Sequence, residues 1–485
     1  MEYSPLVTAI RRTQGLTLNG CPTNTTSSSE LTDLFFQIGA MRSWEEKQIL
    51  ELFGFALEKS PLDTLRMLFY SRDIRGGQGE RRVFRTILTH LANGKYANLI
   101  EKNLFLVPVY GRWDDLLPLL DTKLENQVLH FISTALGDPV AKTLCAKWMP
   151  REKSSKAKYA EKIRKHMRLT KKQYRKLLSE ATQVVETNMC AKNWEDIVFS
   201  HVPSKAMLNY RNAFKKHDQV RWEAYLTDLQ EGTAKVNAEA VYPYEILQKL
   251  DSNAGSEVDS TLLDQQWKAL PNYMENNSSR ILPVVDTSGS MMNGYNMSKG
   301  LYPMTIAVSL GLYIAERHEG PFYKTFMTFS NTPVLQTISG STLAQRVASI
   351  KRADWGMSTD LMAVFDLLLT AAKHNSVSVA DMPDTILILS DMEFDGCVQN
   401  RSLTAYENIQ QKYEAAGYAL PKIIFWNLDA KTSNFPVKFD QNGTALVSGF
   451  SPSILKQILA STDISPEAIM RSVVNSERYS AVQLP

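Results

Sequence analysis

ILPVVDTSGS, residues Ile281 to Ser290, is an apolar run that stops at an acid and continues in small or oxygen-bearing residues. Four of its first five residues are apolar and two are valine, which is typical of a strand buried on both faces. Asp286, Ser288 and Ser290 then fall on one tight loop at the carboxyl end of this strand, where open α/β sheets bind their ligands. Turns are also rich in Asp, Ser and Gly for backbone reasons, so the loop alone does not establish a site.

Two later stretches strengthen the case for a site. DWGMSTD (354–360) places Thr359 before LMAVFDLLLTAA, an apolar helical pattern for which Ser358 is the expected cap. DTILILSD (384–391) predicts a second buried strand that ends in an acid. We therefore expect oxygen ligands to converge at one edge of a parallel sheet. These ligands are Asp286, Ser288, Ser290, Thr359 and Asp391.

This five-residue pattern resembles the metal-ion-dependent adhesion site of von Willebrand factor A domains, over about residues 278–483. The resemblance implies an α/β doubly wound, Rossmann-like domain with a divalent cation. Hard oxygen ligands without imidazole or thiolate suit Mg²⁺ best, with Mn²⁺ or Ca²⁺ as alternatives. In this family the open metal position captures an acidic side chain of a partner protein.

The composition sets limits on the rest of the chain. Its 485 residues are too many for one ordinary core, so two or three domains are expected. The net charge of +3 means that a nucleic-acid surface requires local segregation of charge. Cys21, Cys145, Cys190 and Cys397 lie far apart without zinc-ligand spacing, which indicates free or buried thiols. No signal peptide or apolar run of ~20 residues is evident, so a soluble, cytoplasmic protein is expected.

Three regions follow from patterning along the chain. Residues 1–29 contain NGCPTNTTSSSE, a polar run that predicts a flexible N-terminal arm. Residues 30–277 show helix after helix with short Gly, Pro or Asp breaks, which favours a HEAT-like α-solenoid, open or closed into a ring. Residues 278–485 alternate strand and helix and form the predicted α/β domain.

RGGQGERR (75–82) is the most distinctive break in the helical region. Its three glycines free the backbone between two helices, and Arg72, Arg75, Arg81 and Arg82 surround them. Guanidinium groups beside exposed backbone N–H groups would hold phosphates. The alternative is an inter-helix turn whose arginines pair with acids such as Asp114 and Asp115.

Residues 151–176 carry 12 Lys or Arg against two Glu. Thr170 with Gln173 predicts a capping box, so two short helices are expected here. Tyr159, His166 and Tyr174 interleave aromatic faces for stacking on unpaired bases. A merely solvated helical face is the alternative. The expected RNA contacts in this run are Arg164, Lys165, Arg168, Lys171, Lys172 and Arg175.

The two regions together resemble the Ro ribonucleoprotein family, in which a ring of helical repeats (the TROVE module) is closed by a von Willebrand factor A domain. RDIRGGQGERR, YGRWDDLL, KWMPRE and VPSKAMLNYR look like motifs of an uncharacterised branch of that family, found in viral and cellular genomes. The resemblance covers nearly the whole chain from about residue 31. It implies binding of small structured or misfolded RNA on a basic helical surface.

Three hypotheses follow. The first is an RNA-binding ribonucleoprotein component, which the basic clusters favour. The second is a protein-binding scaffold that captures an acidic partner residue through the metal site. The third is an enzyme, for example a phosphatase that uses Asp286. It is the weakest of the three, because Ser288 stands where such a phosphatase needs a second acid, and no P-loop or G-x-S-x-G motif is present. We therefore expect no enzymatic activity.

Overall fold

The computed structural model describes residues 14–252, 257–275, 277–293, 300–329, 332–352, 358–396, 403–431, 433–461 and 464–485. The chain divides into two compact units. One, here called the α/β unit, combines residues 1–48 with 241–475, and the other, the helical unit, combines 49–240 with 476–485. Each unit therefore contains residues from two separate parts of the sequence.

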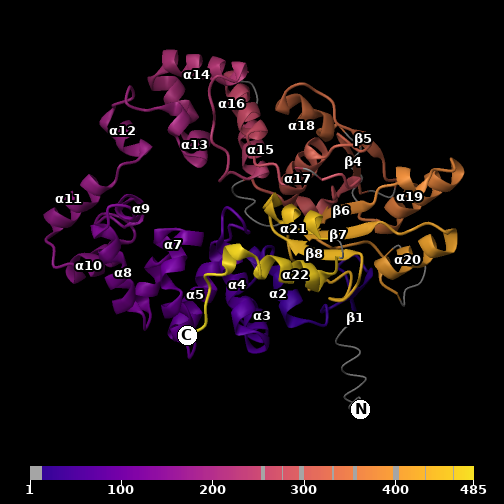
Figure 1. The fold of residues 1–485 in the computed structure, drawn as a ribbon, viewed down its shortest axis with the longest axis horizontal. Helices are drawn as coiled ribbons and strands as arrows, with labels where there is room; N and C mark the ends of the chain where they lie inside the picture. Colours follow the sequence, from indigo (N-terminus) through magenta and orange to yellow (C-terminus); the bar gives the residue numbers. More distant parts are fainter. Residues whose placement is uncertain are drawn as a thin grey trace. The chain divides into compact units, whose positions relative to one another are not determined.

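The α/β unit is built on a six-stranded sheet with the order β5-β4-β3-β6-β7-β8 (Figure 1). β4 and β5 are antiparallel and form the expected hairpin, whereas the other neighbours are parallel. The predicted strand in ILPVV is confirmed and lies between β4 and β6. The strands are β3 (Ile281–Val285), β4 (Thr325–Thr328), β5 (Leu335–Thr337), β6 (Thr385–Ser390), β7 (Lys422–Asn427) and β8 (Thr444–Ser448).

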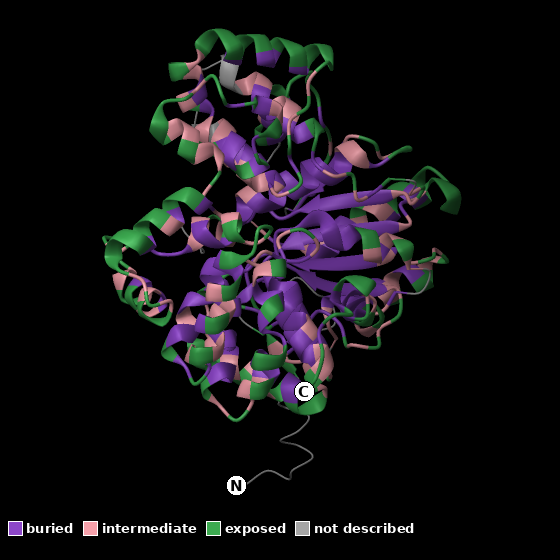
Figure 2. Cartoon of the chain, turned by 60° about the vertical axis from the view of Figure 1, so that its left-hand side comes forward, coloured by how far each residue is buried: buried purple, intermediate pink, exposed green. Residues whose placement is uncertain are grey.

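The central strands are buried on both faces, as their continuous apolar sequences predict (Figure 2). On one face, Leu282 and Ile386 belong to an apolar core with side chains of α19 (Leu361–His374) and α20 (Ala405–Ala416). On the other face, α17 (Pro303–Arg317) lies so close to β3 that a Cβ atom on Gly311 would stand 2.6 Å from Val285 Cγ2. This packing fixes where the strands end and hence where the site lies.

The prediction of a flexible arm over residues 1–29 is wrong for residues 14–29, while residues 1–13 lie outside the described part of the chain. β1 (Gln14–Leu16) and β2 (Pro22–Asn24) form a hairpin, and Asn24 exchanges backbone hydrogen bonds of 3.1 and 2.9 Å with Phe435. Several polar side chains of residues 14–29 are buried. Ser27, for example, donates through its amide to Asp33 Oδ1 at 2.7 Å, which satisfies buried groups inside the unit.

The expected boundary near residue 278 does not coincide with the limit of either compact unit. α15 (Pro243–Ser252) and α16 (Glu257–Lys268) have helical periodicity, but they pack on α17 and on α18 (Leu343–Lys351) respectively. The Trp267 indole donates to Glu316 Oε2 at 2.7 Å, and Asp264 Oδ1 accepts from the Leu343 amide at 2.8 Å. Helical pattern alone could not reveal which unit these helices join.

The helical unit confirms the expected succession of helices. The capping box of Thr170 and Gln173 is present and separates two helices within the basic run. Among the described residues, no helix combines the length and the apolar character needed to cross a membrane. The helices are α3 (Glu46–Lys59), α4 (Pro61–Arg72), α5 (Arg82–Asn93), α6 (Ala97–Lys102), α7 (Val107–Tyr110), α8 (Glu125–Gly137), α9 (Lys142–Trp148), α10 (Ala157–His166), α11 (Lys171–Ala181), α12 (Val185–Ala191), α13 (Ser204–His217) and α14 (Gln219–Glu231).

The segment 476–485 follows the α/β unit in sequence and packs on the helical unit. The Arg478 guanidinium donates to Asp73 Oδ1 at 2.7 Å, and the Tyr110 hydroxyl donates to the Arg478 carbonyl oxygen at 2.5 Å. Asn103 and Gln483 exchange two hydrogen bonds of 2.7 and 3.0 Å. A short segment therefore completes a unit whose other residues lie more than 200 positions earlier in the chain.

Candidate metal centre and basic surface

The ends of three neighbouring strands bring the acidic residues of the candidate site to one edge of the sheet. β3 pairs Val285 with Leu389 of β6, and β6 pairs Ser390 with Asn427 of β7. The residues that follow these strands therefore lie side by side. The Asp286 amide continues the ladder with a 2.9 Å hydrogen bond to the Leu389 carbonyl oxygen.

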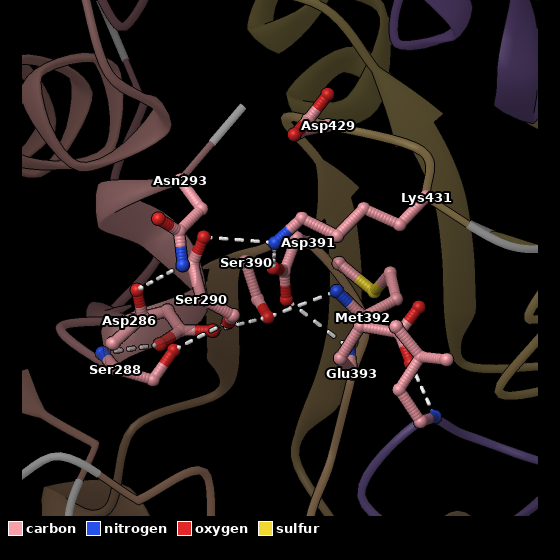
Figure 3. Close-up of polar contacts among 12 residues, drawn as sticks. Asp286, Ser288, Ser290, Asn293, Ser390, Asp391, Met392, Glu393, Asp429 and Lys431 are labelled. Atoms are coloured by element: carbon pink, nitrogen blue, oxygen red, sulfur yellow. Dashed lines mark hydrogen bonds and ion pairs between the residues drawn. The ribbon is translucent and has the colours of Figure 1, made fainter. Parts of the chain in front are cut away.

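The first loop presents a buried carboxylate and two hydroxyls (Figure 3). Asp286 is fully buried, and its carboxylate accepts hydrogen bonds from the Ser390 hydroxyl at 2.5 Å and from the Ser288 amide at 2.9 Å. The Ser288 and Ser290 hydroxyl oxygens lie 2.9 Å apart. The structure thus brings together three of the five predicted ligands.

The fourth predicted ligand, Asp391, is paired with a lysine that the sequence analysis did not identify. Lys431 Nζ lies 2.6 Å from Asp391 Oδ2 and 2.8 Å from the Ser290 carbonyl oxygen (Figure 3). The Asp391 side chain is fully buried, whereas that of Lys431 is 20% exposed. An ammonium group therefore occupies one side of the cluster. Asp286 and Asp391 directly follow their strands, whereas Lys431 lies in the loop after β7, four residues beyond Asn427, so no signal in the sequence marked it.

Burial and like charges change the acidities of the cluster. Burial, together with the negative charge of Asp391, raises the pKa of Asp286 to about 7. Burial also raises the pKa of Asp429, which follows β7 as well, to about 6, although Lys431 acts in the opposite direction. The Arg42 guanidinium also acts to lower the pKa of Asp429. Asp286 and Asp391 are thus two neighbouring buried acids whose direct cationic partner among the described residues is Lys431, an arrangement that would attract a further cation.

Thr359, the fifth predicted ligand, lies in an adjoining hydrogen-bond network. Its hydroxyl donates toward the Glu393 carbonyl oxygen at 2.8 Å and Asp395 Oδ1 at 3.0 Å, and its amide donates to Asp395 Oδ2 at 2.7 Å. Among the described residues, no hydrogen bond joins Thr359 to the other four predicted ligands. Ser358 was expected to cap the following helix, but Asp360 does so by accepting from the Ala363 amide.

The turn after β1 contributes to this network, which the prediction of a flexible arm had excluded. The Leu18 amide donates to Glu393 Oε2 at 2.7 Å, and the Asn19 side-chain amide donates to the Glu393 carbonyl oxygen at 2.7 Å and to Thr359 Oγ1 at 3.3 Å. Asn19 therefore helps to position Thr359, although the two residues are 340 positions apart in the sequence.

The donor chemistry fits a hard divalent cation, although no group of three or more His, Cys, Asp or Glu side chains suited to a metal occurs in the described ranges. Two carboxylates and two hydroxyls supply only oxygen ligands. In an octahedral Mg²⁺ site with bonds of about 2.0–2.1 Å, neighbouring ligand oxygens lie about 2.9 Å apart. The Ser288 and Ser290 hydroxyls, which are hydrogen-bonded to each other at 2.9 Å, lie close enough for both to contact one such cation.

In the helical unit, the structure corrects one predicted RNA contact. Arg72 is only 2% exposed, and its Nε atom lies 2.7 Å from Asp115 Oδ2, so this arginine stabilises the packing of helices rather than a surface. The interpretation of the glycine break as a turn with paired arginines is thus confirmed for Arg72. Arg75, Arg81 and Arg82 are exposed.

Arg81 lies near other arginines and near Asp114, which acts to raise its pKa. Desolvation and the like charges of Arg112 and Arg72 lower the pKa of its guanidinium group. No ion pair of the Arg81 side chain is seen within the described part of the chain. The phosphate contact expected for Arg81 stays a prediction.

The basic run has two sides with different roles. On α10, Lys158 and Lys162 pair with Asp121 at 2.6 and 3.3 Å, and Lys162 also pairs with Glu125 at 3.0 Å, so this side is anchored. Arg164 is partly buried beside Glu152, and Lys165 forms an exposed pair with Glu161. The remaining predicted contacts are exposed and form no ion pair in the regions that the structure describes. They are Arg168, Lys171, Lys172 and Arg175.

The aromatic residues of this run only partly suit base stacking. His166 is exposed, and the Tyr159 hydroxyl donates to Asp121 at 2.7 Å. Tyr174 is 1% exposed and donates to the Pro150 carbonyl oxygen, so its predicted role in stacking is wrong. Tyr174 instead belongs to the apolar face by which α11 packs, which helical spacing could have indicated.

Fold and site together define a class of protein that joins a helical region to an α/β region with acids and hydroxyls at one edge of a parallel sheet. The chain belongs to the family described as domain of unknown function DUF2828, whose model matches residues 17–131 and 126–279. A second model, domain of unknown function DUF7788, matches residues 280–482. The uncharacterized protein L728 of Acanthamoeba polyphaga mimivirus is 30% identical, over 94% of this chain and 86% of that protein.

Proposed function

We propose that this protein binds RNA in the manner of Ro ribonucleoproteins. In this proposal, its helical unit is a HEAT-like repeat module with a basic surface for small structured or misfolded RNA. Its α/β unit is a von Willebrand factor A-like domain. The two basic regions of the helical unit carry the argument, and the metal-site resemblance in the α/β unit supplies the family context.

The observation that carries the proposal is the unneutralised side of α10 and α11. Arg168, Lys171, Lys172 and Arg175 lie within eight residues and are exposed, and no acid pairs with them in the described ranges. Lys158 and Lys162 of α10 differ, because they contact Asp121 and Glu125 of neighbouring segments. A concentrated, unpaired positive surface supports phosphate binding driven by release of counterions.

The exposed arginines at the glycine break add a second candidate contact region. Arg75 and Arg81 are exposed and have no ion-pair partner in the part of the chain that the structure describes. Each phosphate contact contributes separately to the salt dependence of RNA affinity. The number of phosphates that each region neutralises is therefore measurable.

The test is to replace Arg168, Lys171, Lys172 and Arg175 by Gln and to measure affinity for a structured RNA at several salt concentrations. We expect weaker binding, and a slope of log affinity against log salt that is reduced by roughly 0.7 to 0.9 for each phosphate that the variant no longer neutralises. The matched control removes the same charge from other exposed lysines of the helical unit. These are Lys95, Lys102, Lys123 and Lys142. Equal slopes for the variant and the control would contradict the assignment.

A second candidate function is capture of an acidic partner residue by a divalent cation in the α/β unit. The close placement of the buried acids Asp286 and Asp391, whose one ion-pair partner in the described part of the chain is Lys431, favours it. Asp286, Ser288, Ser290 and Asp391 would hold the cation, with Mg²⁺ as the first choice and Mn²⁺ or Ca²⁺ as alternatives. Thr359 would have to exchange its bond with Asp395 to take part. A cation bound here would supply an open position for a carboxylate.

A further inference from the structure

The Lys431 ammonium occupies the position that a cation at this cluster would need. It lies 2.6 Å from Asp391 Oδ2 and 2.8 Å from the Ser290 carbonyl oxygen (Figure 3). Asp391 and Ser290 are two of the residues assigned to the metal. A lysine ammonium and a divalent cation held by the same carboxylate would repel each other strongly, so binding of one disfavours binding of the other.

Among the described residues, no other group of the cluster forms a hydrogen bond with Lys431. The Asp286 carboxylate is already bonded to Ser390 and Ser288, and it makes no ion pair in the described part of the chain. Asp429 acts on Lys431 through its charge, and no hydrogen bond between the two is seen among the described residues. Lys431 is therefore held chiefly by Asp391 and the Ser290 carbonyl. Its side chain, one-fifth exposed, has a flexible four-carbon stem.

We propose that Lys431 is an internal cation that competes with the divalent metal for Asp391. The cluster then has two mutually exclusive states, one held by the ammonium and one held by metal, and the lysine must leave before metal binds. This inference rests on the metal site of the second candidate function. It adds that the chain itself sets the concentration at which metal enters.

Competition of this kind weakens the apparent affinity for metal, because metal binds only to those molecules in which the ammonium has left Asp391. If the ammonium pairs with Asp391 about nine-tenths of the time, the apparent dissociation constant rises about tenfold. If Lys431 competes with the metal, its removal should strengthen metal binding. If Lys431 merely stabilises the loop, its removal should weaken metal binding. The sign of the change therefore separates the two roles.

The experiment measures binding of Mn²⁺ and Mg²⁺ to the full chain by calorimetry, for wild type, Lys431→Met and Lys431→Gln. Methionine keeps the apolar stem, and glutamine gives a polar variant should methionine impair folding. We expect binding to both variants to be at least about tenfold tighter than to wild type. Metal should also raise the thermal unfolding midpoint more in the variants than in wild type.

The matched control is Lys412→Met, which removes an ion pair of 2.7 Å with Asp366 elsewhere in the same unit. It should leave metal affinity unchanged. Equal metal affinities of wild type and the Lys431 variants would overturn the competition while leaving the metal site in place. Weaker binding by the variants would do the same. Absence of binding to all proteins would overturn the metal site itself and the competition with it.

Discussion

At the sheet edge, the placement of single side chains decides what the cluster can bind. Three buried carboxyl groups follow neighbouring strands, and one ammonium, that of Lys431, reaches only Asp391 by direct contact. Asp286 is left with hydroxyl and amide donors as its partners. Hydrogen bonds of this kind only partly offset the cost of burying a charge, so the cluster is destabilised when no further cation is present.

If the proposed metal site exists, replacement of Asp286 by alanine should abolish binding of Mg²⁺ and Mn²⁺, because its carboxylate is the acidic ligand that the first loop would supply. The thermal unfolding midpoint without metal should stay the same or rise, since the variant has one buried acid fewer next to Asp391. Calorimetric titration and thermal denaturation are the measurements. Asp366→Ala removes an acid elsewhere in the unit and should leave metal binding intact, whereas equal binding by Asp286→Ala and wild type would exclude this site.

At the scale of elements, the strands were predictable and the partners of their terminal residues were not. ILPVV and TILILS are continuous apolar runs, and a parallel sheet buries such runs on both faces, so β3, β6 and the acids after them followed from sequence. Lys431 follows the equally apolar strand β7. Its ion pair with Asp391 depends on how the loop after β7 folds back, which no local pattern contains.

Long-range pairing explains the other errors. Residues 14–29 contain too few apolar residues to fold alone, but Cys21 enters the core of the α/β unit and Asn24 pairs with Phe435. The arginines of the glycine break presented the same difficulty. Arg72 and Arg75 are three residues apart, yet one is buried on Asp115 and the other is exposed. Arg72 is the last residue of α4, whereas Arg75 lies in the turn that follows, and composition does not distinguish these two positions.

The contacts of α10 with Asp121 depend on the ionisation of that acid. Although partial burial acts to raise it, hydrogen bonds from Lys158, Tyr159 and Lys162 lower the pKa of Asp121 from 3.8 to about 2. Because the folded pKa lies below the unfolded one, the contribution of Asp121 to stability is complete above about pH 4 and is lost as the pH falls toward 2. The difference in unfolding midpoint between wild type and Asp121→Asn should therefore shrink over this range. A difference that does not change with pH would contradict the pairing.

At the scale of the whole molecule, both units are assembled from segments that are distant in sequence. The Asp73 carboxylate is 1% exposed. It forms an ion pair with the Arg478 guanidinium and accepts a hydrogen bond from the Tyr479 hydroxyl. A Cβ atom on Gly76 would stand 2.5 Å from Arg478 Nε, so the glycine break leaves room for this contact. One function of RGGQGERR is therefore to receive segment 476–485, apart from any role of its exposed arginines.

Arg478→Ala should destabilise the helical unit, because it leaves the buried Asp73 carboxylate with fewer donors. A loss on the order of 2 kcal/mol is expected from removing a partner of a buried charged group. Chemical denaturation of the full chain, followed by amide exchange in α4 and α5, measures the effect. Arg471→Ala is the matched control: Arg471 forms an exposed pair with Glu467 in the same region of sequence and should have little effect.

The return of segment 476–485 has a consequence for synthesis of the protein. A ribosome makes the helices of residues 49–240 first and must then translate the whole α/β region before Arg478 exists. During that interval Asp73 lacks its guanidinium partner. The helical unit therefore reaches its final stability only after the sheet has been translated, and a nascent chain interrupted before residue 476 should expose the helical unit to proteases.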